Sequence, residues 1–266
     1  MKTQSRQAGD SHLDNNVETA DLSRRFGGIE RLYGKDAKTS FSAANVCIVG
    51  IGGVGSWTAE ALARSAVGAM TLIDLDVVAE SNANRQIHAL DGVWGRAKVD
   101  AMRDRILAIN PECKVRVIDD FLDEQNLAQF LAGHHLVVDA IDQVRVKVAM
   151  AVWAVENKVP LVMAGGAGGK LDPTLICMDD LAFTQQDPLL SKVRAQLRKN
   201  HGFSRDLKRK FGIPVVYSRE PLQRMAVCES GGVQGLSCAG YGSGVCVTAS
   251  VGLFAAAKAL QILMVS

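Results

Sequence analysis

The sequence predicts an α/β protein whose doubly wound, mostly parallel sheet carries helices on both faces. Short apolar runs of strand length alternate with longer patterns of helical periodicity along most of the chain. The first strand–helix–strand unit contains a glycine-rich turn and closes on an acidic residue. The chain has 266 residues, of which 48% are hydrophobic, so it can bury a substantial core in one large domain.

The unit with the glycine-rich turn lies within residues 45–85. An apolar run at 46–49 predicts a buried parallel strand, and a helical pattern follows at 54–65. A second apolar run at 70–73 ends on Asp74, where a carboxylate can accept the hydroxyl groups of a ribose. Glycines let the backbone approach a phosphate, and a helix N-terminus offers free N–H groups. This order of elements therefore predicts a Rossmann-like nucleotide-binding unit, which Gly-x-Gly-x-x-Gly alone would indicate only weakly. The glycines of the turn are Gly50, Gly52, Gly53 and Gly55.

A polar loop follows Asp74 and favours a triphosphate over a dinucleotide. It reads SNANRQ at residues 81–86, and a dehydrogenase needs no such cluster of amides and arginine there. Arginine and asparagine can hold several phosphate oxygens at once. Lys98, at the start of a helical pattern at 95–109, can reach the same phosphates, although an exposed first-turn lysine is the alternative. We therefore expect ATP as the cofactor, with these contacts besides the glycines and Asp74: Asp76, Asn82, Arg85, Gln86 and Lys98.

Two acids follow the next buried strand, which is predicted at 136–138. Asp139 and Asp142 lie in the sequence DAIDQ, at the carboxyl end of a central strand and hence over the ligand crevice of a doubly wound sheet. One of them can hold Mg²⁺ that bridges the phosphates. Asp142 also precedes a helical pattern at 144–156, so it can serve as the helix N-cap instead of, or as well as, a metal ligand.

The remaining patterns complete the sheet. They predict a short helix pair at 21–33 that is broken at Gly27–Gly28, a strand at 114–118, an amphipathic helix at 123–131, and strands at 161–164 and 175–178. A second glycine run, AGGAGGK at 164–170, has no helical pattern after it. We interpret it as a close backbone crossing near the substrate and not as another nucleotide turn.

The domain organisation follows from these elements. We expect a disordered polar lead at 1–20 and a nucleotide-binding domain at 21–180. Residues 181–266 should form a C-terminal substrate-binding extension that packs a strand and a helix on the same sheet. Residues 231–257 carry no charge and are long enough to span a bilayer, but their content of Gly, Ser, Thr and Cys favours a buried position over membrane association.

Charge is concentrated in residues 191–224, the basic tract. Ten Lys and Arg stand there against two acids, which gives +8; since the chain carries +2, the remainder carries −6. A basic tract on an acidic body favours a polyanionic partner such as RNA, although an ordinary solvated loop is the alternative. Phe203, Phe211 and Tyr217 are interleaved with the charges and could stack on bases. The expected phosphate contacts are Arg198, Lys199, Arg205, Lys208, Arg209 and Lys210.

Six cysteines are scattered along the chain without any Cys-x-x-Cys pair. This spacing indicates neither a disulfide framework nor a structural zinc site, and it fits the reducing cytoplasm. The N-terminus has no apolar signal core. No general base stands out, because His88 and His201 are lone histidines, which are more often structural.

Several motifs in this order resemble the ubiquitin-activating-enzyme-like (ThiF-type) adenylating family. They are GIGGVG at 50–55, LIDLD at 72–76, SNANRQ at 81–86, Lys98 and DAID at 139–142. The resemblance covers about residues 24–169. Within the family, RRFGGIERLYG, NRQIHAL, the undivided AGGAGG and the lack of paired cysteines are most similar to the branch that cyclises a threonylcarbamoyl group on the adenosine beside the anticodon of tRNA.

This resemblance implies roles for individual residues. Gly52, Gly53 and Gly55 would line the nucleotide turn, Asp74 would hold the ribose, and Asp142 would hold Mg²⁺. Arg25 matches an N-terminal arginine that reaches the phosphates from the other subunit of a homodimer, with Arg24 open as the neighbouring choice. The implied catalytic residues are Arg25, Arg85, Lys98 and Asp142.

The implied reaction is ATP-dependent cyclising dehydration through an adenylated carboxylate. Two alternatives compete with it. One is adenylation of the C-terminus of a ubiquitin-like sulfur-carrier protein, with a sulfur-transfer partner and a cysteine relay at Cys228, Cys238 or Cys246. The other is a nicotinamide oxidoreductase, which would leave SNANRQ and Lys98 without a purpose. The basic tract and the missing zinc cysteines favour tRNA as the partner.

Overall fold

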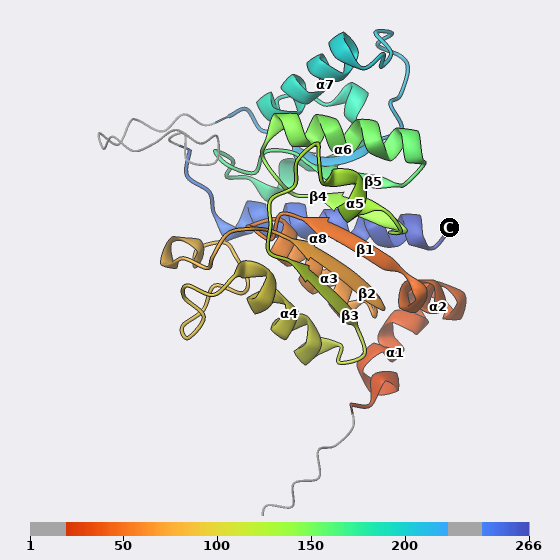
Figure 1. Cartoon of the computed structure of the whole chain (residues 1–266), viewed down its shortest axis with the longest axis vertical. Coiled ribbons are helices and arrows are strands. Elements are labelled where there is room, and N and C mark those ends of the chain that lie inside the picture. Colours follow the sequence, from red (N-terminus) through yellow and green to blue (C-terminus); the bar gives the residue numbers. More distant parts are fainter. Residues whose placement is uncertain (1–19, 223–240, 266) are drawn as a thin grey trace, which may run out of the picture.

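The computed structural model describes residues 20–222 and 241–265 and confirms the α/β prediction. Seven strands form one sheet in the order β3-β2-β1-β4-β5-β7-β6, and all neighbours are parallel except β6 and β7 (Figure 1). The predicted disordered lead lies outside the described residues apart from Ala20. The strands are β1 (Asn45–Val49), β2 (Ala69–Ile73), β3 (Lys114–Ile118), β4 (Leu136–Asp139), β5 (Leu161–Ala164), β6 (Ile176–Asp180) and β7 (Pro214–Ser218).

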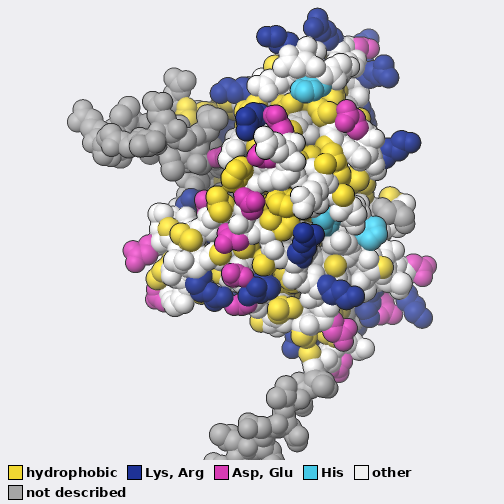
Figure 2. Space-filling model, in the orientation of Figure 1, with side chains coloured by type: hydrophobic (Ala, Val, Ile, Leu, Met, Phe, Trp, Pro, Cys, Tyr) yellow, Lys and Arg dark blue, Asp and Glu magenta, His cyan; other side chains and the backbone are white. Residues whose placement is uncertain are grey.

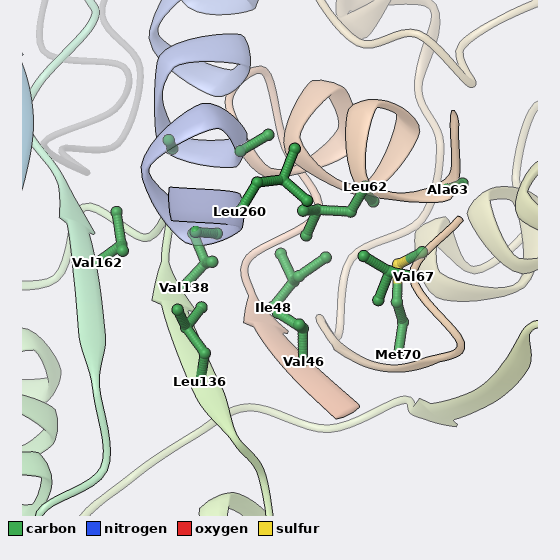
Figure 3. Close-up of a cluster of buried hydrophobic side chains, with 14 of the residues drawn as sticks. Val46, Ile48, Leu62, Ala63, Val67, Met70, Leu136, Val138, Val162 and Leu260 are labelled. Carbon is green, nitrogen blue, oxygen red and sulfur yellow. The ribbon is translucent and has the colours of Figure 1, made fainter. Parts of the chain in front are cut away.

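Helices cover both faces of the sheet (Figure 1). One face packs against α2 (Lys35–Ala43), α3 (Gly55–Arg64), α4 (Lys98–Ile109) and α8 (Val245–Leu263). The other face packs against α5 (Leu127–Leu131), α6 (Val144–Asn157) and α7 (Pro188–Asn200). Alternate residues of one strand point to opposite faces, so Val46 and Ile48 join the first core while Cys47 and Val49 join the second. Figure 3 shows side chains of β1, β4 and β5 gathered with Leu62 of α3 and Leu260 of α8.

The predicted helix pair at the N-terminus is wrong, because residues Leu22–Tyr33 form one continuous helix, α1. Asp21 caps it by accepting a hydrogen bond from the backbone N–H of Arg24 at 3.0 Å. Phe26 is buried in the middle of the helix and anchors it to the protein across the two glycines. Packing therefore outweighs the weak helix propensity of Gly27 and Gly28.

Two other predicted helices are shorter than expected. The helix predicted at 95–109 begins at Lys98, since Gly95 has φ +79°, which is incompatible with an α-helix. The helix predicted at 123–131 begins at Leu127, because the Asp123 carboxylate accepts the backbone N–H groups of Gln125 and Asn126 and forms a turn instead. Both differences place a polar turn directly before the helix.

The C-terminal extension contains one strand that the sequence analysis missed. β7 lies between β5 and β6, and its apolar residues Val215, Val216 and Tyr217 are buried within the charge-rich basic tract. The predicted C-terminal helix is α8, while residues 223–240, where part of the predicted strand would fall, lie outside the described residues. Three short 3-10 turns complete the elements: η1 (Glu80–Asn82), η2 (Pro173–Leu175) and η3 (Leu181–Phe183).

Among the described helices, α8 alone is long and apolar enough to cross a membrane by length and composition. Its inner face is instead part of the core on α3. The Thr58 hydroxyl donates to the Gly252 carbonyl at 3.0 Å, and a Cβ on Gly252 would lie 2.4 Å from the Val54 carbonyl oxygen. Only glycine permits this close approach of two backbones, so α8 packs against α3 as part of the layer that covers the sheet.

Candidate functional site

A cleft of about 670 Å³ runs along the carboxyl edge of the parallel strands, from the loop after β3 to the loop after β5. The chain runs from β1 through β2 to β3 on one side and then returns to β4 on the other side of β1, so the strand order reverses beneath the cleft. Ligands of doubly wound sheets bind at such a switch point. We refer to the two ends as the β3 end and the β5 end.

The glycine turn at residues 50–55 forms the floor of the cleft below α3. Gly50 has φ +87°, and a Cβ on Gly55 would lie 1.8 Å from the Gly50 carbonyl oxygen, so neither position tolerates a side chain. Val54 at the N-cap of α3 supplies no side-chain hydrogen bond. The N–H of Ser56 donates to the Gly52 carbonyl at 3.1 Å, and a phosphate can bind at the other N–H groups of this helix start.

Asp74 is fixed at the end of β2 by two backbone hydrogen bonds. Its Oδ2 accepts the N–H of Ile51 at 2.6 Å, and its Oδ1 accepts the N–H of Asp76 at 2.9 Å. Burial raises the pKa of this carboxyl, while Lys98 and the backbone donors oppose the rise. The carboxylate lines the cleft in one orientation, as a ribose ligand requires.

Lys98 is buried, which excludes the alternative of an exposed first-turn lysine. Its Nζ lies 2.6 Å from Oδ2 of Asp76, and both residues line the cleft. The Asp76 side chain is 73% exposed, so the ion pair sits at the cleft wall with its lysine anchored inside. A triphosphate would meet a cation that is already held in place.

The SNANRQ loop carries Arg85 into the same wall. The indole N–H of Trp57 on α3 donates to the Arg85 carbonyl at 2.9 Å, and a guanidinium nitrogen of Arg85 donates to the Ser81 carbonyl at 2.8 Å. A Cβ on Gly53 would lie 3.2 Å from the Arg85 side chain, so the arginine packs on the glycine turn. Asn82 and Gln86 are buried beside it and also line the cleft.

The two acids after β4 have different surroundings. Asp139 is fully buried, and its Oδ1 accepts a hydrogen bond from Nζ of Lys147 at 2.9 Å. Asp142 lines the cleft. The N-cap of α6 is Gln143, without a side-chain hydrogen bond, so the predicted capping role of Asp142 is wrong. The chain stays extended through residue 143, which leaves this carboxylate facing the cleft.

The donor set fits Mg²⁺ that is shared with phosphates. Within residues 20–222 and 241–265, no group of three or more His, Cys, Asp or Glu side chains could hold a metal ion alone. Mg²⁺ typically binds one or two carboxylates and completes its shell with water and substrate phosphates. Asp142 can supply one such carboxylate.

Several cleft residues were missed by the sequence analysis. Phe121 and Leu122 follow β3 and line the β3 end, where they offer an apolar surface to a base. Lys192 and Tyr241 line the β5 end. One signal was available for the second group: Asp187–Pro188 is a typical helix start, with Asp as N-cap and Pro at the first position.

The structure does not bring Arg25 to the cleft. Its guanidinium donates to the carbonyls of Ala108 and Ile109 at 3.2 and 2.8 Å, where it closes the C-terminus of α4. Arg24 is exposed, and among the described residues its side chain forms no hydrogen bond or ion pair. Neither arginine lines the cleft within the chain.

The candidate general bases also lie outside the cleft. His88 is buried, and burial lowers its pKa to about 4. His201 is exposed at the C-terminal end of α7. Neither histidine lines the cleft, so the structure supports the structural interpretation of both.

The basic tract consists of most of α7, the loop at 201–213 and β7, and it continues past the last described residue before the gap. Figure 2 shows Lys and Arg side chains around the end of the molecule that carries α7. Arg198 is only partly exposed, since it donates to the Ser204 carbonyl at 3.1 Å and lies over the Phe211 ring. The other five predicted phosphate contacts are exposed: Lys199, Arg205, Lys208, Arg209 and Lys210.

The prediction that aromatic residues of the tract stack on bases is wrong for Tyr217, because this side chain is buried in β7. Phe203 and Phe211 pack edge to face, with ring centroids 4.9 Å apart, against the core on the α6 and α7 face. Their rings hold the loop at 201–213 to the sheet. The charges of this loop are exposed while its aromatic side chains are structural.

The chain is similar to proteins of one family of adenylating enzymes. The model of the ThiF family matches residues 23–265. The tRNA threonylcarbamoyladenosine dehydratase of Escherichia coli K12 is 48% identical over 251 residues, which are 91% of this chain and 94% of that protein. A crystal structure of the E. coli tRNA N6-threonylcarbamoyladenosine dehydratase in complex with ATP superposes with a TM-score of 0.84 at 47% identity, over 92% of this chain and 96% of that one. The molybdopterin-synthase adenylyltransferase of E. coli is 35% identical over only 60% of this chain.

Proposed function

This chain belongs to the ThiF family, and we propose that it is an ATP-dependent enzyme that cyclises threonylcarbamoyladenosine in tRNA with loss of water. The observation that carries the proposal is the similarity to a tRNA threonylcarbamoyladenosine dehydratase along nearly the whole of both chains. The cleft agrees with it, because glycine turn, ribose acid and phosphate cations converge in one place.

ATP would lie in the part of the cleft that extends from the β3 end to the glycine turn. Its adenine rests on the apolar surface of Phe121 and Leu122, its ribose hydroxyls meet Asp74, and its phosphates lie over the glycine turn. Arg85 and Lys98 face the phosphates from the wall formed by the SNANRQ loop and α4. A solved relative of the same fold binds ATP.

Adenylation gives the substrate carboxylate a better leaving group. The threonine carboxylate is a poor acyl donor because hydroxide leaves badly. One carboxylate oxygen attacks the α-phosphorus of ATP and pyrophosphate departs, which gives a mixed anhydride. The carbamoyl group then attacks the activated carbonyl, AMP departs with that oxygen, and the ring closes. The net change in the nucleoside is loss of water.

The protein contributes position and charge. Arg85 and Lys98 neutralise charge that develops as pyrophosphate leaves, and both are held in place before the substrate binds. Asp142 would hold Mg²⁺, which when bound supplies Lewis-acid stabilisation to the phosphate oxygens. Asp76, which pairs with Lys98, keeps that ammonium group at the cleft wall.

A homodimer completes the proposal. α8 exposes an apolar outer face at Val245, Leu253 and Phe254, which a second copy of the chain would cover. The second copy would also supply an N-terminal arginine to the cleft. Since Arg25 is engaged at the end of α4, Arg24 is the better placed of the pair.

The basic tract binds the tRNA backbone. Its exposed cations lie on the same helix that reaches the cleft at Lys192, so a bound RNA would run from the tract to the site of reaction. We place the enzyme in the cytoplasm with its tRNA substrate.

The sulfur-carrier alternative has less support. The chain lacks paired cysteines, and the adenylyltransferase relative matches a smaller part of it. Of the three cysteines considered for a sulfur relay with a partner protein, Cys246 is exposed at the start of α8, and Cys228 and Cys238 lie outside the described residues. A sulfur-transfer partner is therefore the weaker proposal.

The test is direct. Purified protein is incubated with ATP, Mg²⁺ and tRNA that carries threonylcarbamoyladenosine, and the digested nucleosides are weighed by mass spectrometry. We expect threonylcarbamoyladenosine to lose one water only when ATP is present. An unchanged nucleoside, together with ATP–pyrophosphate exchange that needs a ubiquitin-like carrier protein, would replace this proposal by the alternative.

A further inference from the structure

Two aromatic rings line the cleft at opposite ends. Phe121 follows β3, whereas Tyr241 lies beside the second glycine run after β5, where a Cβ on Gly168 would lie 3.9 Å from the Cβ of Tyr241. β3 and β5 are separated by four strand spacings in the sheet, or roughly 19 Å at about 4.8 Å each. The cleft therefore extends well beyond the apolar surface at Phe121 and Leu122, and its β5 end is left for a second ligand.

Tyr241 is held by its neighbours. The N–H of Gly169 donates to the Gly242 carbonyl at 2.8 Å, and the amide of Asn84 donates to the Ser243 carbonyl at 2.7 Å. These bonds tie the loop of Tyr241 to both the second glycine run and the SNANRQ loop. The small residues Gly165, Gly166, Ala167 and Gly168 line the cleft at this end.

A cation without a partner lies at the same end. Among the described residues, Nζ of Lys192 on α7 forms no ion pair or hydrogen bond, although the residue lines the cleft. The neighbouring Lys170 is engaged, since its Nζ donates to the carbonyls of Gln186 and Glu220. Lys192 is therefore the lysine that an anion would meet at this end.

The first turn of α7, which precedes Lys192, is fixed by Asp187, a buried residue at the N-cap of the helix. Its Oδ1 accepts the N–H of Leu190 at 2.9 Å, and its Oδ2 accepts the N–H of Gly166 at 2.8 Å. One carboxylate thus joins the start of the basic helix to the second glycine run. The start of α7 and the loop of Tyr241 are thus both hydrogen-bonded to the second glycine run.

We propose that the β5 end is a second nucleoside site, which takes the modified adenosine of the tRNA with its base on Tyr241 and an adjacent backbone phosphate at Lys192. The proposal rests on the proposed function. In the proposed ATP pose, the α-phosphate lies over the glycine turn after β1, which is two strand spacings or about 10 Å from β5. The threonylcarbamoyl arm spans four bonds from the base to its carboxyl carbon, or roughly 5–6 Å when extended. The carboxylate C–O bond and an attack distance of about 3–3.5 Å make up the remainder, so a base at Tyr241 would bring the carboxylate to the α-phosphate.

The experiment compares substitutions at the two ends. Tyr241→Leu keeps bulk but removes the ring, so the KM for modified tRNA should rise about tenfold, while Tyr241→Phe should stay near wild type. Lys192→Met should raise the same KM several-fold and reduce the salt slope of tRNA binding by about one. Phe121→Leu should weaken ATP instead. Lys35→Met, an exposed lysine of α2 remote from the cleft, is the matched control.

Wild-type cyclisation, measured first, tests the proposed function; if it fails, the second nucleoside site falls with it. With an active wild type, the site is overturned if Tyr241→Leu and Lys192→Met leave the KM for tRNA at the Lys35→Met value. It is also overturned if they weaken ATP and tRNA equally. Lys192→Met changes an exposed side chain, so it gives a clear answer even if Tyr241→Leu disturbs its loop.

Discussion

The two ends of the cleft are built differently. At the β3 end, Asp74, Lys98 and Arg85 are each fixed by hydrogen bonds or ion pairs within the protein. At the β5 end, the backbone is fixed by Asp187, but the ammonium group of Lys192 has no partner among the described residues. A small triphosphate can be met by preorganised groups. On our proposal, the β5 end takes a nucleoside of the tRNA and offers it a ring, a cation and open space.

Loss of the charge-handling groups should have the largest effect. Asp142→Ala and Arg85→Ala should each lower the rate of ATP cleavage by about 10²–10³-fold or more, because phosphoryl chemistry depends on neutralising developing charge. ATP–pyrophosphate exchange in the presence of modified tRNA measures the effect, and circular dichroism should show an intact fold. Exchange at the wild-type rate in either variant would refute the assignment of the ATP half.

The next effect concerns the link between the two ends. Lys147 is fully buried and donates to Asp139 at the end of β4 and to the Ala164 carbonyl at the end of β5. Lys147→Met leaves a buried carboxylate alone, so the free energy of unfolding should fall by about 3–5 kcal/mol. Chemical denaturation measures it.

The double variant Lys147→Met with Asp139→Leu provides the control. It removes both charges and should recover most of the stability. A single variant as stable as the wild type would show that the buried pair does not hold β4 and β5 together.

Acid should destabilise the fold through two buried histidines. Burial lowers the pKa of His88 to about 4 and also lowers that of His134, which bonds the Thr71 hydroxyl on β2. The unfolded chain binds these protons near pH 6.5, so stability is fully present above that pH and falls as the pH drops toward 4. His88 accounts for on the order of 2–3 kcal/mol. His88→Gln should flatten the loss, as denaturation at pH 5 and 7 can test; an unchanged pH dependence would contradict the buried neutral state.

The smallest effect is expected for tRNA binding by the basic tract. Reversing Lys208, Arg209 and Lys210 to Glu should raise the Kd for tRNA about tenfold and flatten its salt dependence, because phosphate contacts release counterions. ATP affinity should not change, since these side chains are exposed on the loop at 201–213. Unchanged tRNA affinity at low salt would mean that the RNA docks elsewhere.

The sequence was most informative for the parts of the site whose residues lie close together along the chain. The glycine turn, Asp74 and the SNANRQ loop lie within one strand–helix–strand unit, and six of the seven strands were predicted. The sequence could not show that Phe121 and Tyr241 line the same cleft, because only the order of the strands in the sheet brings their loops to its edge. β7 was hidden because its short apolar run lies within a highly charged tract, and charge masked the core-facing role of Phe203 and Phe211.

The central claim is that the carboxylate of the substrate is adenylated, and the fate of its oxygen tests this most directly. Modified tRNA is prepared with heavy-isotope oxygen in the threonine carboxylate and is turned over with ATP and Mg²⁺. We expect AMP to carry one labelled oxygen and pyrophosphate to carry none, because the carboxylate attacks the α-phosphorus and AMP departs with that oxygen. Label in inorganic phosphate with formation of ADP, or AMP without label, would contradict adenylation of the carboxylate.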